Sequence, residues 1–293
     1  FLSYNLQDLI MRCIPYPDKI FFQFLTKLTL HPTFSEELAA IIVPSFIAQD
    51  VPQERSLVVI ECLIDIIQAN DAMIMPILNS DFLERTIPQL GKVIYTISTF
   101  FRFCKISLST IPDAREALMR VNMCSFLEFA LKLIEKKELS FADMLTQALK
   151  SDASKSEIMP SANEELITQA FSLMSLLINQ NCFDQFQWVN GYNFADKFIK
   201  GEVPFQAKRA MVDFLLKYLL LSPNTTVSTL INEELIRAIM EIIAVSLSSN
   251  ETGELDNGYL TALSQLAVKY ETAGVKDIIN QLNEEFDLTL NIE

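Results

Sequence analysis

The residue types that carry out most enzyme chemistry are scarce in this chain. Its one histidine, His31, precedes a proline at the expected end of a helix, where a structural or exposed imidazole is the ordinary interpretation. No glycine-rich phosphate loop, HExxH, GxSxG or EF-hand pattern occurs, and Asp256-Asn257-Gly258 is a turn without the downstream ligands of a calcium loop. Because catalysis needs several convergent polar groups, we predict a protein that is not an enzyme and uses no metal or cofactor.

The cysteines likewise give no sign of metal binding or redox chemistry. They form an odd set without a CxxC pair or a partnered histidine, in or beside apolar segments: Cys13, Cys62, Cys104, Cys124 and Cys182. This pattern is typical of buried thiols in a reducing compartment. We therefore predict a cytoplasmic protein, with the nucleus as the alternative.

The charge balance limits the class of partner. Lys and Arg number 23 and Asp and Glu number 37, so the net charge is −14, and such a field repels the phosphates of nucleic acid. The acidic excess concentrates in residues 31–100 and 271–293. Either it keeps an exposed face soluble or it attracts a basic partner. No apolar run reaches the length of about 18 residues that a membrane span needs, so we expect no membrane insertion.

A tetrad that opens an apolar helical run recurs along the chain. The copies are Ser35–Leu38, Ser80–Leu83, Cys124–Leu127, Gly191–Phe194 and Asn232–Leu235, with a looser sixth at Val275–Ile278. Their last residues lie 45, 44, 67, 41 and 43 positions apart. A period of 41–45 residues in a helical chain is typical of stacked armadillo or HEAT-type units. We therefore predict an all-α fold, a right-handed α-solenoid of about six units that forms one domain over residues 1–293.

A second internal similarity supports duplication. The segment that begins at Val51-Pro52 aligns without gaps to the one that begins at Val203-Pro204, and Glu61 then matches Asp213. Apolar spacing and stop signals predict helices throughout. Their approximate spans are 4–13, 18–30, 36–48, 52–69, 71–79, 81–90, 92–109, 112–121, 125–137, 164–179, 183–189, 193–200, 204–221, 226–231, 233–248, 258–271 and 274–285.

Residues 73–85 resemble the first and second helices of an armadillo unit, and the long helix that follows would be the third. The resemblance covers residues from about 18 to 285 and rests on period and apolar pattern. Only Gly191 and Gly274 lie near the corner where armadillo units usually carry glycine, so a HEAT subtype stays open. The third helices lack the Asn and Trp residues by which nuclear-import adaptors of this family read basic peptides, and they lack the basic ladder of β-catenin-like grooves.

One long spacing predicts an insertion at residues 138–162. Ser140–Asp143 is a capping-box pattern, and an amphipathic helix and a polar, serine-rich loop are expected after it. The insertion either decorates the neighbouring unit or forms a docking or phosphorylation-controlled element.

The resemblance implies that the third helices line a concave groove. Polar residues repeat on one face of these helices, so we predict a mixed-charge ladder that is either a binding groove or a solvated face. The candidate binding residues are Glu61, Asp65, Thr99, Arg102, Lys105, Ser172, Ser175, Asp213, Lys217 and Gln265. Trp188, which lies among glutamines in an aromatic-rich region, is a further candidate as an exposed anchor.

Two functions follow. The leading hypothesis is a non-enzymatic scaffold or adaptor that binds a protein or peptide segment, with basic residues opposite Glu61 and Asp65. The alternative is a structural subunit of a larger transport, coat or tethering assembly, because solenoid ends and edges also make contacts.

Overall fold

The computed structural model describes residues 12, 21, 23, 24, 27, 53–90, 93–135, 162–192, 194, 203–223, 231–249, 254–271 and 274–286. Within these residues every regular element is a helix, which confirms the predicted all-α class. None of the described helices has both the length and the apolar composition needed to cross a membrane. The predicted helices 4–13, 18–30, 36–48, 193–200 and 226–231 lie wholly or largely outside the described residues, as does the 138–162 insertion apart from its last residue.

The described helices follow the predicted spans closely. They are α4 (Gln53–Ala69), α5 (Ile74–Asn79), α6 (Phe82–Gln89), α7 (Ile94–Thr110), α8 (Ala114–Arg120), α9 (Met123–Glu135), α11 (Ala162–Leu177), α13 (Phe205–Leu221), α15 (Glu233–Ser249), α16 (Glu254–Lys269) and α17 (Val275–Phe286). Two short segments are 3-10 helices instead of α-helices: η1 (Asp71–Met73) and η2 (Phe183–Gly191). At η1 the Asn70 side chain accepts a hydrogen bond from the Ala72 amide at 3.1 Å, which satisfies one of the first, otherwise unpaired donors.

The gapless alignment of the two Val-Pro segments is reproduced by the helix boundaries. α4 and α13 are both 17 residues long, and their first and last residues are the ones that the alignment pairs. In each copy the helix begins directly after the proline, where the missing N–H would have no intrahelical partner in any case. Both helices are apolar on most sides, so each is buried among neighbours.

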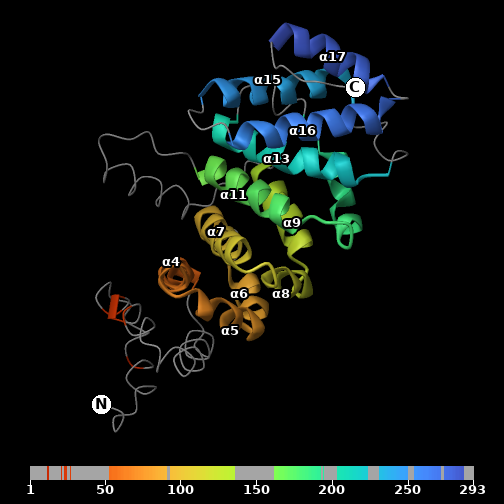
Figure 1. Ribbon diagram of the computed structural model, residues 1–293. Coiled ribbons are helices and arrows are strands. Elements are labelled where there is room, and N and C mark those ends of the chain that lie inside the picture. Colours follow the sequence, from red (N-terminus) through yellow and green to blue (C-terminus); the bar gives the residue numbers. More distant parts are fainter. Residues whose placement is uncertain are drawn as a thin grey trace. The chain divides into compact units, whose positions relative to one another are not determined.

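The chain divides into two compact units, residues 1–173 and 174–293, and α11 contributes residues to both. In the first unit α4 packs along α7, α5 packs on α8, and α6 lies against α4 and α5 (Figure 1). Among the described helices of this unit α7 is the most enclosed, since every side chain from Ile94 to Phe101 is buried. Edge-on contacts of the Phe82 and Phe103 rings, with centroids 5.7 Å apart, join α6 to α7.

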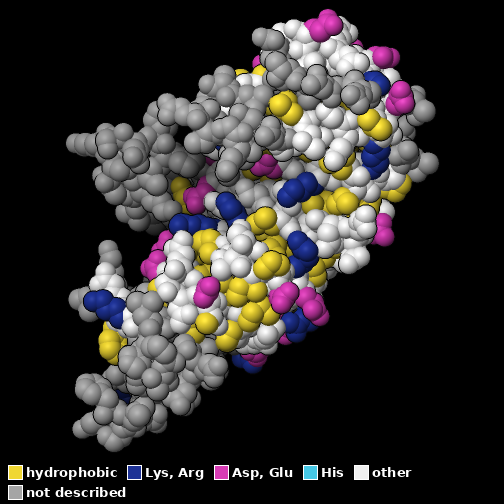
Figure 2. All heavy atoms as spheres, in the orientation of Figure 1, with side chains coloured by type: hydrophobic (Ala, Val, Ile, Leu, Met, Phe, Trp, Pro, Cys, Tyr) yellow, Lys and Arg dark blue, Asp and Glu magenta, His cyan; other side chains and the backbone are white. Residues whose placement is uncertain are grey.

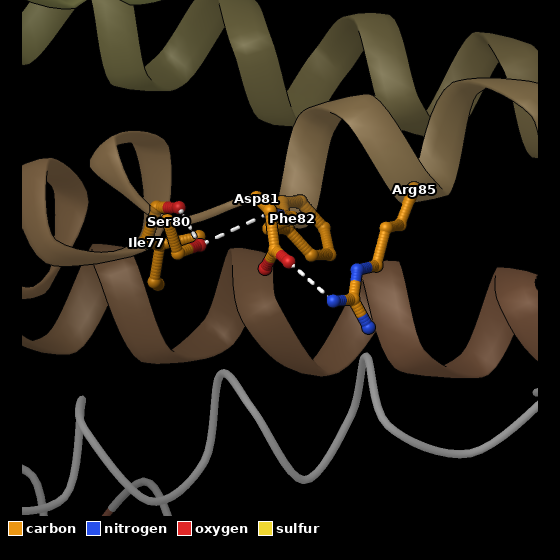
Figure 3. A network of polar contacts seen from close by, with 5 residues as sticks. All are labelled: Ile77, Ser80, Asp81, Phe82 and Arg85. Atoms are coloured by element: carbon orange, nitrogen blue, oxygen red, sulfur yellow. Dashed lines mark hydrogen bonds and ion pairs between the residues drawn. The ribbon is translucent and has the colours of Figure 1, made fainter.

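Ser80 joins the end of α5 to the start of α6 (Figure 3). Its Oγ donates to the Ile77 carbonyl at 2.6 Å and accepts from the Phe82 amide at 3.1 Å. Ser80 thus caps the start of α6 with its side chain, although the residue directly before the helix is Asp81. Asp81 forms an exposed ion pair with Arg85 at 2.6 Å, one helical turn away.

In the second unit α13 packs against α15 and α16, and α17 packs against α15 and α16 (Figure 1). Asn232 caps α15, because its side-chain oxygen accepts a hydrogen bond from the Leu235 amide at 2.8 Å. The aromatic residues of η2 face α13, where the rings of Phe183 and Tyr218 lie with centroids 5.0 Å apart. This region is therefore core, and the aromatic cluster is explained by packing.

Among the described copies of the tetrad, the last residue is buried in every copy except one. The last residues Leu83, Leu127, Phe194 and Leu235 are at most 2% exposed. In the looser sixth copy Ile278 is only half-buried, and Ile279 fills the core position instead. α17 therefore buries Val275, Ile279 and Leu282, which share one helical face.

Candidate functional site

The predicted ladder lies on α4, α7, α11, α13 and α16, which we refer to as the third helices. On α4 the carboxylates of Glu61 and Asp65 are both exposed, one turn apart, and Gln68 continues the exposed face. Between them the Cys62 thiol is buried, and burial together with the nearby Asp65 charge raises its pKa. A thiol that resists ionisation is a poor nucleophile and metal ligand, so the exposed groups among the described side chains of α4 are carboxylates and an amide.

On α7 the three predicted residues separate. Thr99 is buried, and its Oγ1 donates to the Tyr95 carbonyl of the same helix at 2.8 Å. The prediction that this side chain belongs to an exposed face is therefore wrong, because the first two turns of α7 are enclosed. Arg102 is exposed and Lys105 is half-buried. Burial, and then the charge of Arg102, lower the pKa of Lys105.

On α11 the predicted serines contribute little exposed surface. Ser172 is half-buried and Ser175 is buried, so the placement of Ser175 on a solvated ladder is also wrong. The polar group that Ser175 contributes is its carbonyl, which accepts a hydrogen bond from Lys217 Nζ at 2.9 Å.

Asp213 of α13 lies in a polar cluster with Arg209 of the same helix and Tyr259 of α16. The Tyr259 hydroxyl donates to the Asp213 carboxylate at 2.5 Å and accepts from Arg209 Nε at 3.3 Å. Burial raises the pKa of Asp213, although the Tyr259 hydrogen bond and the charges of Arg209 and Lys217 act in the opposite direction. Burial and the adjacent carboxylate raise the pKa of Tyr259 to about 12. The cluster joins two neighbouring helices, and its members satisfy one another.

Lys269 and Tyr270 close the end of α13. Lys269 Nζ donates to the carbonyls of Leu219 at 3.1 Å, Ser222 at 2.6 Å and Leu220. The Tyr270 hydroxyl donates to the Leu219 carbonyl at 2.7 Å and lies 3.3 Å from the Ser222 carbonyl. The last carbonyls of a helix have no intrahelical partner and carry its negative partial charge, so an ammonium is a favourable cap.

Lys217 of α13 makes the same kind of contact with the end of α11, because its acceptor, the Ser175 carbonyl, lies in the last turn of that helix. Both lysines are followed by tyrosine, as Lys217-Tyr218 and Lys269-Tyr270. The sequence contained this signal, a Lys-Tyr pair repeated near the ends of two third helices, but composition alone does not indicate its role. Lys217 was predicted as a ligand-binding residue, and the structure gives it a capping contact.

Of the remaining candidates, Gln265 is exposed on α16. Trp188 is half-buried in η2, and its Nε1 is enclosed without a hydrogen-bond partner in the described part of the chain. The prediction of an exposed Trp188 anchor is therefore corrected to a partly enclosed ring.

Acidic and basic side chains are interspersed on the face drawn in Figure 2, with apolar side chains between them. Among the described residues no group of His, Cys, Asp and Glu side chains is arranged to hold a metal ion. In the comparisons with known proteins, no family model, curated protein or solved structure matches the chain.

Proposed function

We propose that the chain is a non-enzymatic scaffold or adaptor, an armadillo- or HEAT-like α-solenoid whose third helices bind a segment of a partner protein. The observation that carries the proposal is the sequence separation between residues that make polar contacts from one helix to another. Apart from Tyr218 with Asn190, which spans 28 residues, side-chain contacts between described helices that are distant in the sequence reach acceptors 41 to 51 residues away, close to the tetrad period. Examples are Arg120 with Asn79, Lys217 with Ser175, Tyr259 with Asp213, Arg237 with Glu285, and Tyr270 with Leu219.

The packing within each unit supports the same proposal. α4 lies on α7 in the first unit and α13 on α16 in the second, so third helices neighbour each other. α5 on α8 and α15 on α17 repeat this relation for other helices. Contact of each element with its counterpart one period away is what a stack of equivalent units requires.

The exposed side chains favour the first unit as the binding region. Glu61, Asp65 and Arg102 are exposed there, whereas Lys217, Lys269 and Asp213 of the second unit are engaged in contacts between helices. A partner segment with basic residues opposite Glu61 and Asp65 fits these charges. The internal use of polar groups in the second unit favours the alternative, a structural subunit of a larger assembly, for that part of the chain.

Charge reversal tests the proposal. Glu61→Lys with Asp65→Lys should slow partner association and reduce its salt dependence, with the fold intact, because exposed helix charges contribute little to stability. Glu84→Lys with Glu116→Lys changes the charge equally, at exposed positions on α6 and α8, and serves as the control.

Photo-cross-linking from position 65, compared with position 84, identifies the surface that the partner covers. Cross-links from position 84 and none from position 65, together with unchanged binding of the α4 variant, would remove the third-helix face as the binding surface. Co-purification of the native protein in one large, stable assembly would favour the subunit function instead.

A further inference from the structure

Three of the third helices, α7, α13 and α16, carry a lysine near their end. One of these lysines has a different environment from the other two. Lys217, four residues before the end of α13, and Lys269, the last residue of α16, donate to carbonyls at the end of the preceding third helix. Lys105 lies five residues before the end of α7, which packs along α4. In the described part of the chain, Lys105 has neither a hydrogen bond nor an ion pair.

Arg102 lies three residues before Lys105, so both side chains share one face of α7. Among the described residues Arg102 also has no hydrogen-bond or ion-pair partner. The electrostatic neighbour of the half-buried Lys105 ammonium among the described residues is therefore another cation, and burial, followed by this repulsion, lowers the pKa of Lys105. Two other half-buried cations have acceptors among the described residues: Lys269 has carbonyls and Arg209 has the Tyr259 hydroxyl.

Two adjacent cations with no acceptor among the described residues repel each other in the unbound protein. Burial weakens the hydration of Lys105, and repulsion from Arg102 adds to the cost. An anion that contacts both groups relieves both penalties and forms charge-assisted hydrogen bonds. Arg presents a planar fork that matches a carboxylate, and Lys adds a compact charge beside it.

We infer that Arg102 and Lys105 form an anion-binding pair on α7 that takes the carboxylate of an Asp or Glu side chain in a partner segment. The inference rests on the proposed function and names the chemistry of one contact. Charge complementarity carries it: the pair is a local positive site in a chain of net charge −14, so an acidic segment binds here against the overall field. With Glu61 and Asp65 on the adjacent α4, the partner segment would carry both basic and acidic residues.

The test uses the full chain and a fluorescent oligoglutamate peptide, with binding followed by anisotropy. Arg102→Gln with Lys105→Gln should weaken binding by about tenfold or more, since charge-assisted contacts to both cations are lost. The matched control is Arg85→Gln with Lys132→Gln, an equal change of charge at exposed positions on α6 and α9. We expect that control to change the affinity by less than about twofold, because exposed charges act weakly at a distance.

Three results would overturn the inference: no binding of oligoglutamate by the wild-type chain, equal binding by the α7 variant, or an equal loss in the control. Competition experiments show whether the pair prefers a carboxylate or a phosphate. A phosphoserine peptide or inorganic phosphate that displaces oligoglutamate at much lower concentration would replace the carboxylate by a phosphate.

The inference and the proposed function fail separately. A cellular partner that cross-links at position 65 but binds the Arg102→Gln, Lys105→Gln variant normally refutes the anion pair alone. Retained oligoglutamate binding at α7, without any partner on the third-helix face, refutes the groove alone. Circular dichroism should show an intact helical fold in the variant, since the substitutions are at exposed and half-buried positions.

Discussion

Replacing Lys269 by methionine should lower the free energy of unfolding of the second unit by about 1.5–3 kcal/mol, the usual contribution of hydrogen bonds to a charged group. Methionine retains most of the side-chain stem, so the change removes the ammonium and little packing. The ammonium has three acceptors at the end of α13, on Leu219, Leu220 and Ser222. The Leu220 carbonyl, to which Tyr270 does not donate, would lose this cap.

The Tyr270 hydroxyl shares the other two acceptors, so the two residues should be coupled. Tyr270→Phe alone should cost about 1 kcal/mol, because Lys269 still serves the Leu219 and Ser222 carbonyls. In the double variant both carbonyls lose their side-chain donors. The double loss should exceed the sum of the single losses by about 0.5 kcal/mol or more, the range measured for residues that share partners.

Urea denaturation, with hydrogen exchange of the last turn of α13, measures these losses. Lys276→Met is the control, since among the described residues Lys276 makes only a 4.0 Å ion pair with the exposed Glu271, and its effect should stay within about 0.5 kcal/mol. If Lys269→Met unfolds like the wild type or like the control, or if the double loss is additive, then the cap does not couple α13 to α16.

Further substitutions test the register, one corrected site residue and one buried hydroxyl. Leu83→Asp and Leu235→Asp should each cost several kcal/mol, since both leucines are at most 2% exposed, and denaturation curves like that of the parent would refute the register. Thr99→Val should leave partner binding unchanged and shift the unfolding free energy by about 1 kcal/mol or less, because its hydroxyl bonds within its own helix; weakened binding would return Thr99 to the site. Tyr259 has its pKa raised to about 12, so the stability that its neutral phenol confers is fully present below pH about 10 and is lost as the pH rises through 12. Ultraviolet titration of Tyr259→Phe should lack one late-titrating phenol, and an unchanged titration curve would contradict this assignment.

The sequence by itself determined the helices, because apolar periodicity and prolines act locally. α4 and α13 begin after their prolines and pair as the gapless alignment predicts. Buried Leu83, Leu127 and Leu235 followed from the recurring tetrad. The 3-10 form of η1 and η2 did not follow, since i→i+3 and i→i+4 bonding suit nearly the same side-chain pattern.

Only the tertiary structure decided which polar residues face solvent. Thr99 and Ser175 occur at polar ladder positions, yet both are buried, and a hydroxyl that bonds its own helix, like that of Thr99, is tolerated there. Lys217 and Lys269 are identical in type to Lys105, but their acceptors lie 42 to 50 residues away on another helix. The distinction between a capping lysine and one with no acceptor in the described part of the chain therefore depends on packing between helices, which local sequence does not encode.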